Sequence, residues 1–318
     1  MQYSLVVGAF GVVALALVGC TGSTDTTVAT SGRPAAPTTM GTTVVDTTTA
    51  RTSTNPGATP EPSAPATTAS SPAVPSSRKP APVPAQPFLT SANVYWLWAV
   101  PTAAEGRQEV LGAGHREVEG PAVLRSAVQA LFEGPDPAEV EAGMVSEIPL
   151  GSRLLEASID RFGTATLNLS AEFDAPSGTL SETARVAQVV FTATQFPTVD
   201  RVRFQIDGVD RTELASHGID VAGGADRAGF AGVRPVVLVE EPHPGAVLPP
   251  SFRISGESSV RSVAWAVTDG EGEILAEGIT LAGARGGWTP FRATVDLPDG
   301  LQGRGAVIVF EPKHGFPT

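Results

Sequence analysis

The sequence predicts an α+β unit, a mixed sheet with two covering helices, followed by an all-β sandwich. Two observations predict this fold class. Residues 88–216 show strand and helix patterns in the order strand, strand, helix, hairpin, helix, strand, which is typical of a layered α+β fold. Residues 234–318 contain six short apolar or alternating runs, separated by Gly, Pro and Asp-Gly turns and lacking any helical period. That spacing favours an antiparallel β-sandwich.

The first unit begins with a strand that we expect to be buried on both faces, because residues 93–100 (NVYWLWAV) are aromatic and apolar. A second short strand is expected at residues 115–118. A helix should follow Gly120-Pro121, since proline suits the first helical turn, and it should end at Gly134-Pro135. The apolar residues at helical spacing between these points are Val123, Leu124, Ala127, Val128, Leu131 and Phe132.

The middle of this unit predicts a hairpin and a second helix. Residues 154–159 and 164–169 alternate apolar and polar side chains around a turn, which is a hairpin pattern. Thr179 and Glu182 have the spacing of a capping box at the start of the helix. One face of this helix is apolar and the opposite face is polar: Leu180, Ala184, Ala187 and Phe191 against Arg185, Gln188, Thr192 and Gln195. Residues 201–206 close the unit as a strand.

The strands of the second unit are expected at residues 235–240, 251–256, 263–268, 274–280, 288–297 and 306–310. Trp265 and Trp288 belong to the expected sandwich core. Between the two units, residues 217–233 are rich in glycine and indicate a loop or linker.

The N-terminus indicates export and a lipid anchor. Residues 5–18 are apolar and uncharged, too few to span a bilayer but suited to the core of a signal peptide. The run Leu17-Val18-Gly19-Cys20 that follows resembles a bacterial lipobox, in which the cysteine receives diacylglycerol. We therefore expect residues 1–20 to be a lipoprotein signal peptide, with Cys20 lipidated and the protein held on the outer face of the cytoplasmic membrane.

Residues 21–87 predict a disordered tether, because they are rich in Thr, Pro, Ala and Ser and contain no aromatic residue. Both an O-glycosylated tract and a bare linker fit this composition. Either one would hold the folded units away from the membrane surface.

Charge and composition exclude several function classes. The formal net charge of −12 leaves no basic surface for nucleic acid. The single cysteine excludes an internal disulfide and a thiolate metal cluster. The four histidines lie far apart in the sequence, and no common nucleophile motif occurs. Glu213 and His217 could share a helix face as metal ligands, although a solvated pair fits better, so we predict neither a cofactor nor a metal.

Three arginines are candidates for binding. Arg201 and Arg203 alternate on one strand face and, together with Arg185, could donate charge-assisted hydrogen bonds to an anionic glycan. Solvent-facing strand residues are the simpler interpretation. Tyr95, Trp96 and Trp98 could form a sugar-stacking platform, although core packing is more common for such a strand.

Several separated motifs occur in a fixed order along the first unit: Leu131–Pro135, Ile148–Leu155, Ala165–Ser170 with Phe173, Gln188–Thr192, Gln195–Pro197 and Val202–Gly208. Together they resemble the sporulation and spore germination domain called GerMN. The second unit, through Val239–Gly245, Phe252–Gly256, Val267–Gly270, Ile274–Gly278 and Ile308–Glu311, is similar to the immunoglobulin-like domain Gmad2. The resemblance implies an extracytoplasmic binding or assembly module without an established catalytic centre.

The sequence therefore predicts a membrane-anchored, wall-facing lipoprotein that is not an enzyme and binds a cell-wall polymer or another envelope protein, with a link to sporulation or germination. Two alternatives stay open. One is a peptidoglycan hydrolase or a hydrolase cofactor, and the other is an extracytoplasmic ligand receptor with a pocket where the two units meet.

Cys20→Ala should release the protein from the membrane fraction, because Cys20 is the sole thiol and closes the apolar leader. Fractionation of cells expressing either form measures this. Unchanged membrane partitioning of the variant would exclude the lipid anchor.

Overall fold

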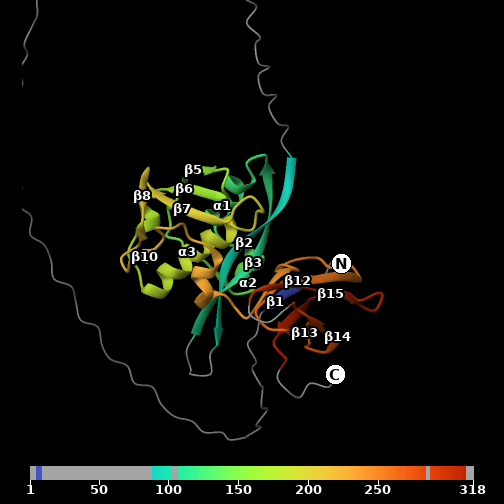
Figure 1. Ribbon diagram of the computed structural model, residues 1–318. Helices are drawn as coiled ribbons and strands as arrows, with labels where there is room; N and C mark the ends of the chain where they lie inside the picture. The colour runs from blue at the N-terminus through green and yellow to red at the C-terminus, as the bar shows by residue number, and fades with distance from the viewer. Residues whose placement is uncertain (1–4, 9–87, 102–106, 284–286, 313–318) are drawn as a thin grey trace, which may run out of the picture. The chain divides into compact units, whose positions relative to one another are not determined.

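A computed structural model describes residues 5–8, 88–101, 107–283 and 287–312 (Figure 1). All of these residues belong to one compact unit. Cys20 and the expected tether lie outside the described residues. No helix in the described part of the chain is long and apolar enough to cross a bilayer.

A long hairpin forms the first sheet. Its strands are β2 (Phe88–Pro101) and β3 (Arg107–Gly120), and the short β4 (Met144–Val145) pairs with the other edge of β2. Both expected strands are present and each is longer than predicted. Tyr95 and Trp96 are fully buried and Trp98 nearly so, which leaves no ring face open to a sugar.

Two helices follow this hairpin. The predicted first helix is confirmed as α1 (Val123–Glu133), and Leu124, Val128 and Leu131 pack into the core. The five-residue α2 (Pro137–Glu141) was not predicted from the sequence. Its capping box uses the Asp136 and Glu139 side chains, and Glu139 is buried in an ion pair with Arg116 of β3.

The second sheet has the order β5-β6-β7-β8. The predicted hairpin is confirmed as β5 (Leu154–Ile159) and β6 (Thr164–Leu169). β7 (Arg201–Ile206) runs parallel to β6, and β8 (Val209–Arg211) pairs antiparallel with β7. The connection from β6 to β7 contains a short 3₁₀ helix, η1 (Ala171–Asp174), and the helix α3 (Thr179–Ala193).

From Ala184 to Ala193 both faces of α3 are buried, which corrects the amphipathic pattern predicted from the sequence. Leu180, assigned to the apolar face, is 81% exposed, whereas Arg185, Gln188 and Thr192 of the polar face are at most 2% exposed. The capping box is also wrong, because Gly178 is the N-cap and no side chain caps the first turn. The buried Gln188 and Thr192 side chains bind backbone groups at one edge of β2.

Side chains of α3 and of the residues after it bind the backbone of β2 where no strand pairs with that edge. Thr192 Oγ1 accepts a hydrogen bond from the Tyr95 amide, and the Gln188 amide donates to the Tyr95 carbonyl. Gln195 binds both the amide and the carbonyl of Asn93. Buried backbone groups need such partners, so the helix takes the place of a strand at this point.

The predicted sandwich is also confirmed. One sheet contains β11 (Val237–Glu241), β12 (Ser251–Ser258) and β15 (Thr289–Asp296). The other contains β13 (Ser262–Asp269), β14 (Ile274–Leu281) and β16 (Gly305–Phe310), and β1 (Leu5–Gly8) pairs parallel with β16. Trp265 and Trp288 are partly buried against the core.

The segment expected to be a loop or linker is packed. After the short strands β9 (Glu213–Leu214) and β10 (Ile219–Asp220), Ala225 bridges to β7. The 3₁₀ helix η2 (Arg227–Val233) then buries Phe230 and Val233. Apolar side chains between the glycines fix this connection, so its glycine content did not indicate an exposed linker.

Gln188→Met should lower the free energy of unfolding by about 2–4 kcal/mol, because it strips the Tyr95 carbonyl and the Glu147 amide of their partner inside the protein. Urea denaturation measures the loss. Leu180→Ala, in the exposed first turn of the same helix, is the control and should change stability by less than about 0.5 kcal/mol. Equal stability of the Gln188 variant and wild type would contradict this role of α3.

Candidate functional site

Alternation along β7 creates an open polar sheet face. Val202 and Phe204 are buried, whereas Arg201 and Arg203 point outward and are exposed. In the parallel register, Arg203 lies opposite Thr166 of β6. This outer sheet face consists of the outward residues of three strands: Glu156, Ser158, Thr166, Asn168, Arg201, Arg203 and Gln205.

The two outward arginines are lightly restrained. One guanidinium nitrogen of Arg201 lies 3.3 Å from the Gly223 carbonyl oxygen, and Arg203 has no ion pair among the described residues. Arg203 does act on nearby Asp160, where backbone hydrogen bonds from Thr164 and Phe162 and, to a smaller degree, the arginine lower the pKa of the carboxyl. The exposed donors of Arg203 can therefore bind an anionic group from solution.

Arg185 does not belong to this face, so its predicted role in binding an external anion is wrong. Its guanidinium is buried and donates to the carbonyls of Phe173 and Ala175 at 2.8 and 2.7 Å, and to the Glu147 carbonyl at 3.1 Å. Burial lowers its pKa, and nearby carboxylates including Glu182 oppose that shift. Arg185 holds loops together and is inaccessible to a polymer.

A buried carboxylate, Glu182, lies beside Ser216 and His217. His217 Nδ1 is 2.8 Å from Glu182 Oε2, and the Ser216 hydroxyl donates to Glu182 Oε1 at 2.6 Å. Burial opposes ionisation of Glu182, but hydrogen bonds from Ser216, Ser177 and His217 outweigh it and hold its pKa well below the ordinary value.

These three residue types occur in hydrolases, but their connection here differs from a catalytic triad. In a triad the acid binds one ring nitrogen of histidine and the serine binds the other. Here Ser216 binds the carboxylate directly and also lies 3.1 Å from the same Nδ1 atom of His217. The group therefore orders the segment after β9 and does not activate a serine.

His115, His217 and His243 lie in the described part of the chain, and each contacts another titratable side chain. His217 pairs with Glu182 instead of Glu213, and no group of three or more His, Cys, Asp or Glu side chains suits a metal among the described residues. His115 and His243 lie far apart in the sequence, yet their rings stack with centroids 4.6 Å apart. Their separation of more than one hundred positions hid this contact from sequence reasoning.

A second polar cluster joins the first sheet to the sandwich. The buried Tyr95 hydroxyl donates to Glu240 of β11 at 2.5 Å. Arg227 of η2 donates to Glu257 of β12 at 2.9 Å, and Arg234 binds the same carboxylate. Burial raises the pKa of Tyr95 and lowers the pKa of Arg234 to about 10, so at neutral pH the phenol keeps its proton and the guanidinium its charge.

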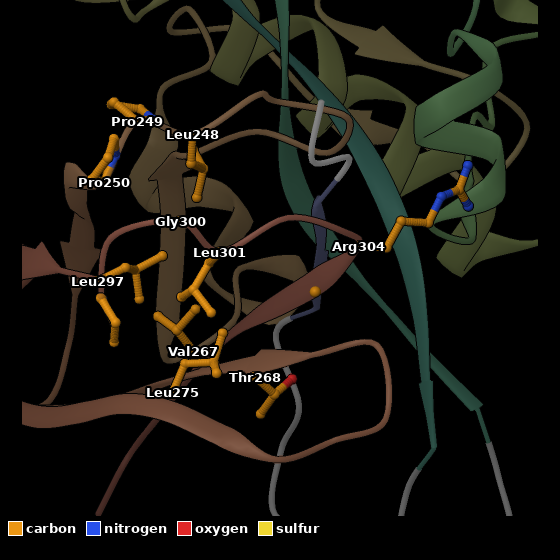
Figure 2. A pocket seen from close by; sticks show the side chains of 12 residues that line it. Leu248, Pro249, Pro250, Val267, Thr268, Leu275, Leu297, Gly300, Leu301 and Arg304 are labelled. Atoms are coloured by element: carbon orange, nitrogen blue, oxygen red, sulfur yellow. The ribbon is translucent and has the colours of Figure 1, made fainter. Parts of the chain in front are cut away.

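An apolar pocket at one end of the sandwich is a weaker candidate (Figure 2). Leu248, Leu297, Leu301 and Val267 line it, together with Arg304 just before β16. Its volume of about 90 Å³ is below the ~300 Å³ at which ligand pockets begin. We assign it to imperfect packing between the two sheets.

Comparison with known proteins assigns both halves of the described chain. Residues 93–212 match the family Germane, described as "Sporulation and spore germination". Residues 236–315 match Gmad2, the "Immunoglobulin-like domain of bacterial spore germination". No curated protein sequence matches this chain.

Three solved structures are similar. The first GerMN domain of the sporulation protein GerM from Bacillus subtilis has a TM-score of 0.35 and 19% identity, covering 44% of this chain and 98% of that chain. The tandem GerMN domains of the same protein have a TM-score of 0.35 and 16% identity, covering 65% of this chain and 61% of that chain. A chain from Clostridium perfringens named "Putative Lipoprotein" has a TM-score of 0.32 and 18% identity, covering 46% of this chain and 93% of that chain.

Glu182→Gln should destabilise the protein most at neutral pH. The folded pKa of Glu182 lies below its ordinary value of 4.5, so its stabilisation is fully present above pH 4.5 and is lost as pH falls toward the folded pKa. Urea denaturation at a series of pH values should show the gap between variant and wild type narrowing in acid. Glu271→Gln, at an exposed turn, is the control. A gap that stays constant or widens in acid would refute the assigned ionisation.

Proposed function

We propose that this chain, which joins a Germane domain to a Gmad2 domain, is a wall-facing lipoprotein that acts by binding a polymer or protein of the cell envelope. Both domain families are linked to sporulation and germination, and neither is known as a family of enzymes. The lipid anchor rests on the lipobox-like run that ends at Cys20.

The observation that carries the binding role is the outer sheet face. A sheet with one solvated face is common, but this one presents two outward arginines and a single acidic residue, Glu156, among Thr, Ser, Asn and Gln side chains in a chain of net charge −12. Arg201 and Arg203 are two residues apart on one strand, which spaces them by about 6–7 Å. That spacing suits successive anionic groups along an extended polymer.

Catalysis is the main rival. A peptidoglycan hydrolase needs a nucleophile, a paired acid and base, or a metal, in a site that substrate can enter. The strongest candidate in the described chain is the Glu182–Ser216–His217 group. Its hydrogen bonds join Ser216 to the carboxylate and do not activate the serine. Wall binding without turnover is therefore the better-supported function.

The test is co-sedimentation of the purified protein with isolated cell walls at increasing salt. The double variant Arg201→Ala, Arg203→Ala should weaken binding roughly two- to five-fold per arginine, from ~0.5–1 kcal/mol for each exposed contact. Added salt should weaken wild-type binding in the same way. Arg253→Ala is the matched control, since Arg253 is exposed on β12 of the other domain.

Two outcomes would count against the proposal. Binding that is insensitive both to salt and to the double variant would exclude the outer sheet face. Release of soluble muropeptides by the protein, lost in a Ser216→Ala variant, would establish the hydrolase instead.

A further inference from the structure

A polar cleft lies where β2, the end of α3, η2 and the first strands of the sandwich meet. Its lining residues come from both domains: Asn93, Thr194, Gln195, Arg227, Glu240 and Glu257. Its volume of about 390 Å³ falls within the ~300–1,000 Å³ of small-molecule sites. The cleft shares no residue with the outer sheet face, so it requires an explanation of its own.

Hydrogen bonds inside the protein fix two walls of the cleft. Gln195 binds both backbone groups of Asn93, at 2.7 and 2.6 Å. Arg227 donates to Thr194 Oγ1 at 3.0 Å and to Glu257 at 2.9 Å, and its guanidinium lies over the Phe191 ring at 4.8 Å. Side chains held this way lose little entropy when a ligand binds.

Three polar groups in the cleft remain unused by the described residues. The Tyr95 hydroxyl donates to Glu240 Oε1, and Arg227 and Arg234 both donate to Glu257 Oε2. This leaves Glu240 Oε2 and Glu257 Oε1 as open acceptors. The side-chain amide of Asn93 makes no hydrogen bond, although its backbone makes two. Asn93 and Tyr95 are two residues apart on β2, so both side chains point to the same face. The cleft thus needs a ligand with several O–H or N–H donors.

Charge then selects among such ligands. Arg227, Glu240 and Glu257 line the cleft, and Arg234 pairs with Glu257 from outside the lining, so the formal charges of these four side chains sum to zero. A cationic ligand would meet the Arg227 guanidinium, and an anionic ligand would meet the two open carboxylate oxygens. A neutral ligand with several hydroxyl groups satisfies the acceptors without either repulsion.

We propose that this junction cleft binds a neutral, hydroxyl-rich ligand of the size of one sugar ring, with Glu240, Glu257 and Asn93 as its hydrogen-bonding groups. Glu240 and Glu257 accept hydrogen bonds from neighbouring hydroxyls, and the Asn93 amide both donates and accepts. This site is separate from the outer sheet face and adds a second ligand to the proposed function.

The experiment titrates the full-length protein calorimetrically with glucose, glucosamine and glucuronate, at a pH where the amine is charged. These probes share one ring and differ in charge. Glucose should bind saturably with a dissociation constant of about 1 mM, and the two charged sugars at least several-fold more weakly. No saturable binding of glucose, or equal or tighter binding of a charged sugar, would overturn the proposal.

Two variants locate the site. Asn93→Ala should lower the affinity for glucose about ten-fold with no change in the thermal unfolding midpoint, because the side-chain amide has no partner among the described residues. Glu240→Gln should also lower the affinity, and its carboxamide oxygen can still accept from Tyr95. Glu277→Gln, at an exposed position on β14, is the control. Unchanged affinity in both cleft variants would overturn the assignment, whereas a loss confined to Arg203→Ala would point to the sheet face.

Discussion

The structure of the first domain depends on the hydrogen bonds between α3 and the backbone of β2. An unpaired strand edge inside a protein leaves amides and carbonyls without partners, at a cost of about 1–3 kcal/mol for each group. Thr192, Gln188 and Gln195 remove this cost by binding the backbone of Asn93 and Tyr95. The helix can therefore pack directly against the strand edge, and a third strand, β4, pairs only beyond this point.

The same helix connects the two domains. Its end supplies Thr194 and the Phe191 carbonyl, both of which accept hydrogen bonds from Arg227. Arg227 also forms an ion pair with Glu257 of β12, and Glu257 in turn binds Arg234. Buried ion pairs contribute little net stability when compared with apolar packing, but removing one partner leaves a costly unpaired charge. This chain of contacts consequently favours one arrangement of η2 against both domains.

Much of the fold could be predicted from local patterns. Short apolar or alternating runs located the six sandwich strands β11 to β16 and the hairpin β5–β6. The strand β1 was not predicted, because its residues belong to the apolar run that indicated a signal peptide. The elements β4 and α2 are too short to produce a period. Burial of the polar face of α3 was not predicted, for a physical reason. A stripe of polar residues at helical spacing gives the same sequence pattern whether it faces water or an unpaired strand edge. Contacts such as His115 with His243, or Glu182 with His217, join positions distant in sequence and carry no local pattern.

The arginines show how far residue type alone can define a site. Arg185, Arg203 and Arg227 have the same side chain, and the sequence marks only a helix, strand or loop context for each. Arg185 is enclosed by carbonyls and Arg227 by carboxylate, hydroxyl and aromatic groups, so their donors are already occupied. Arg203 lies on a sheet face whose strands are covered on the other side only, and its donors remain available. The packing of the opposite side of the sheet, and not the arginine itself, thus determines which cation can bind a ligand.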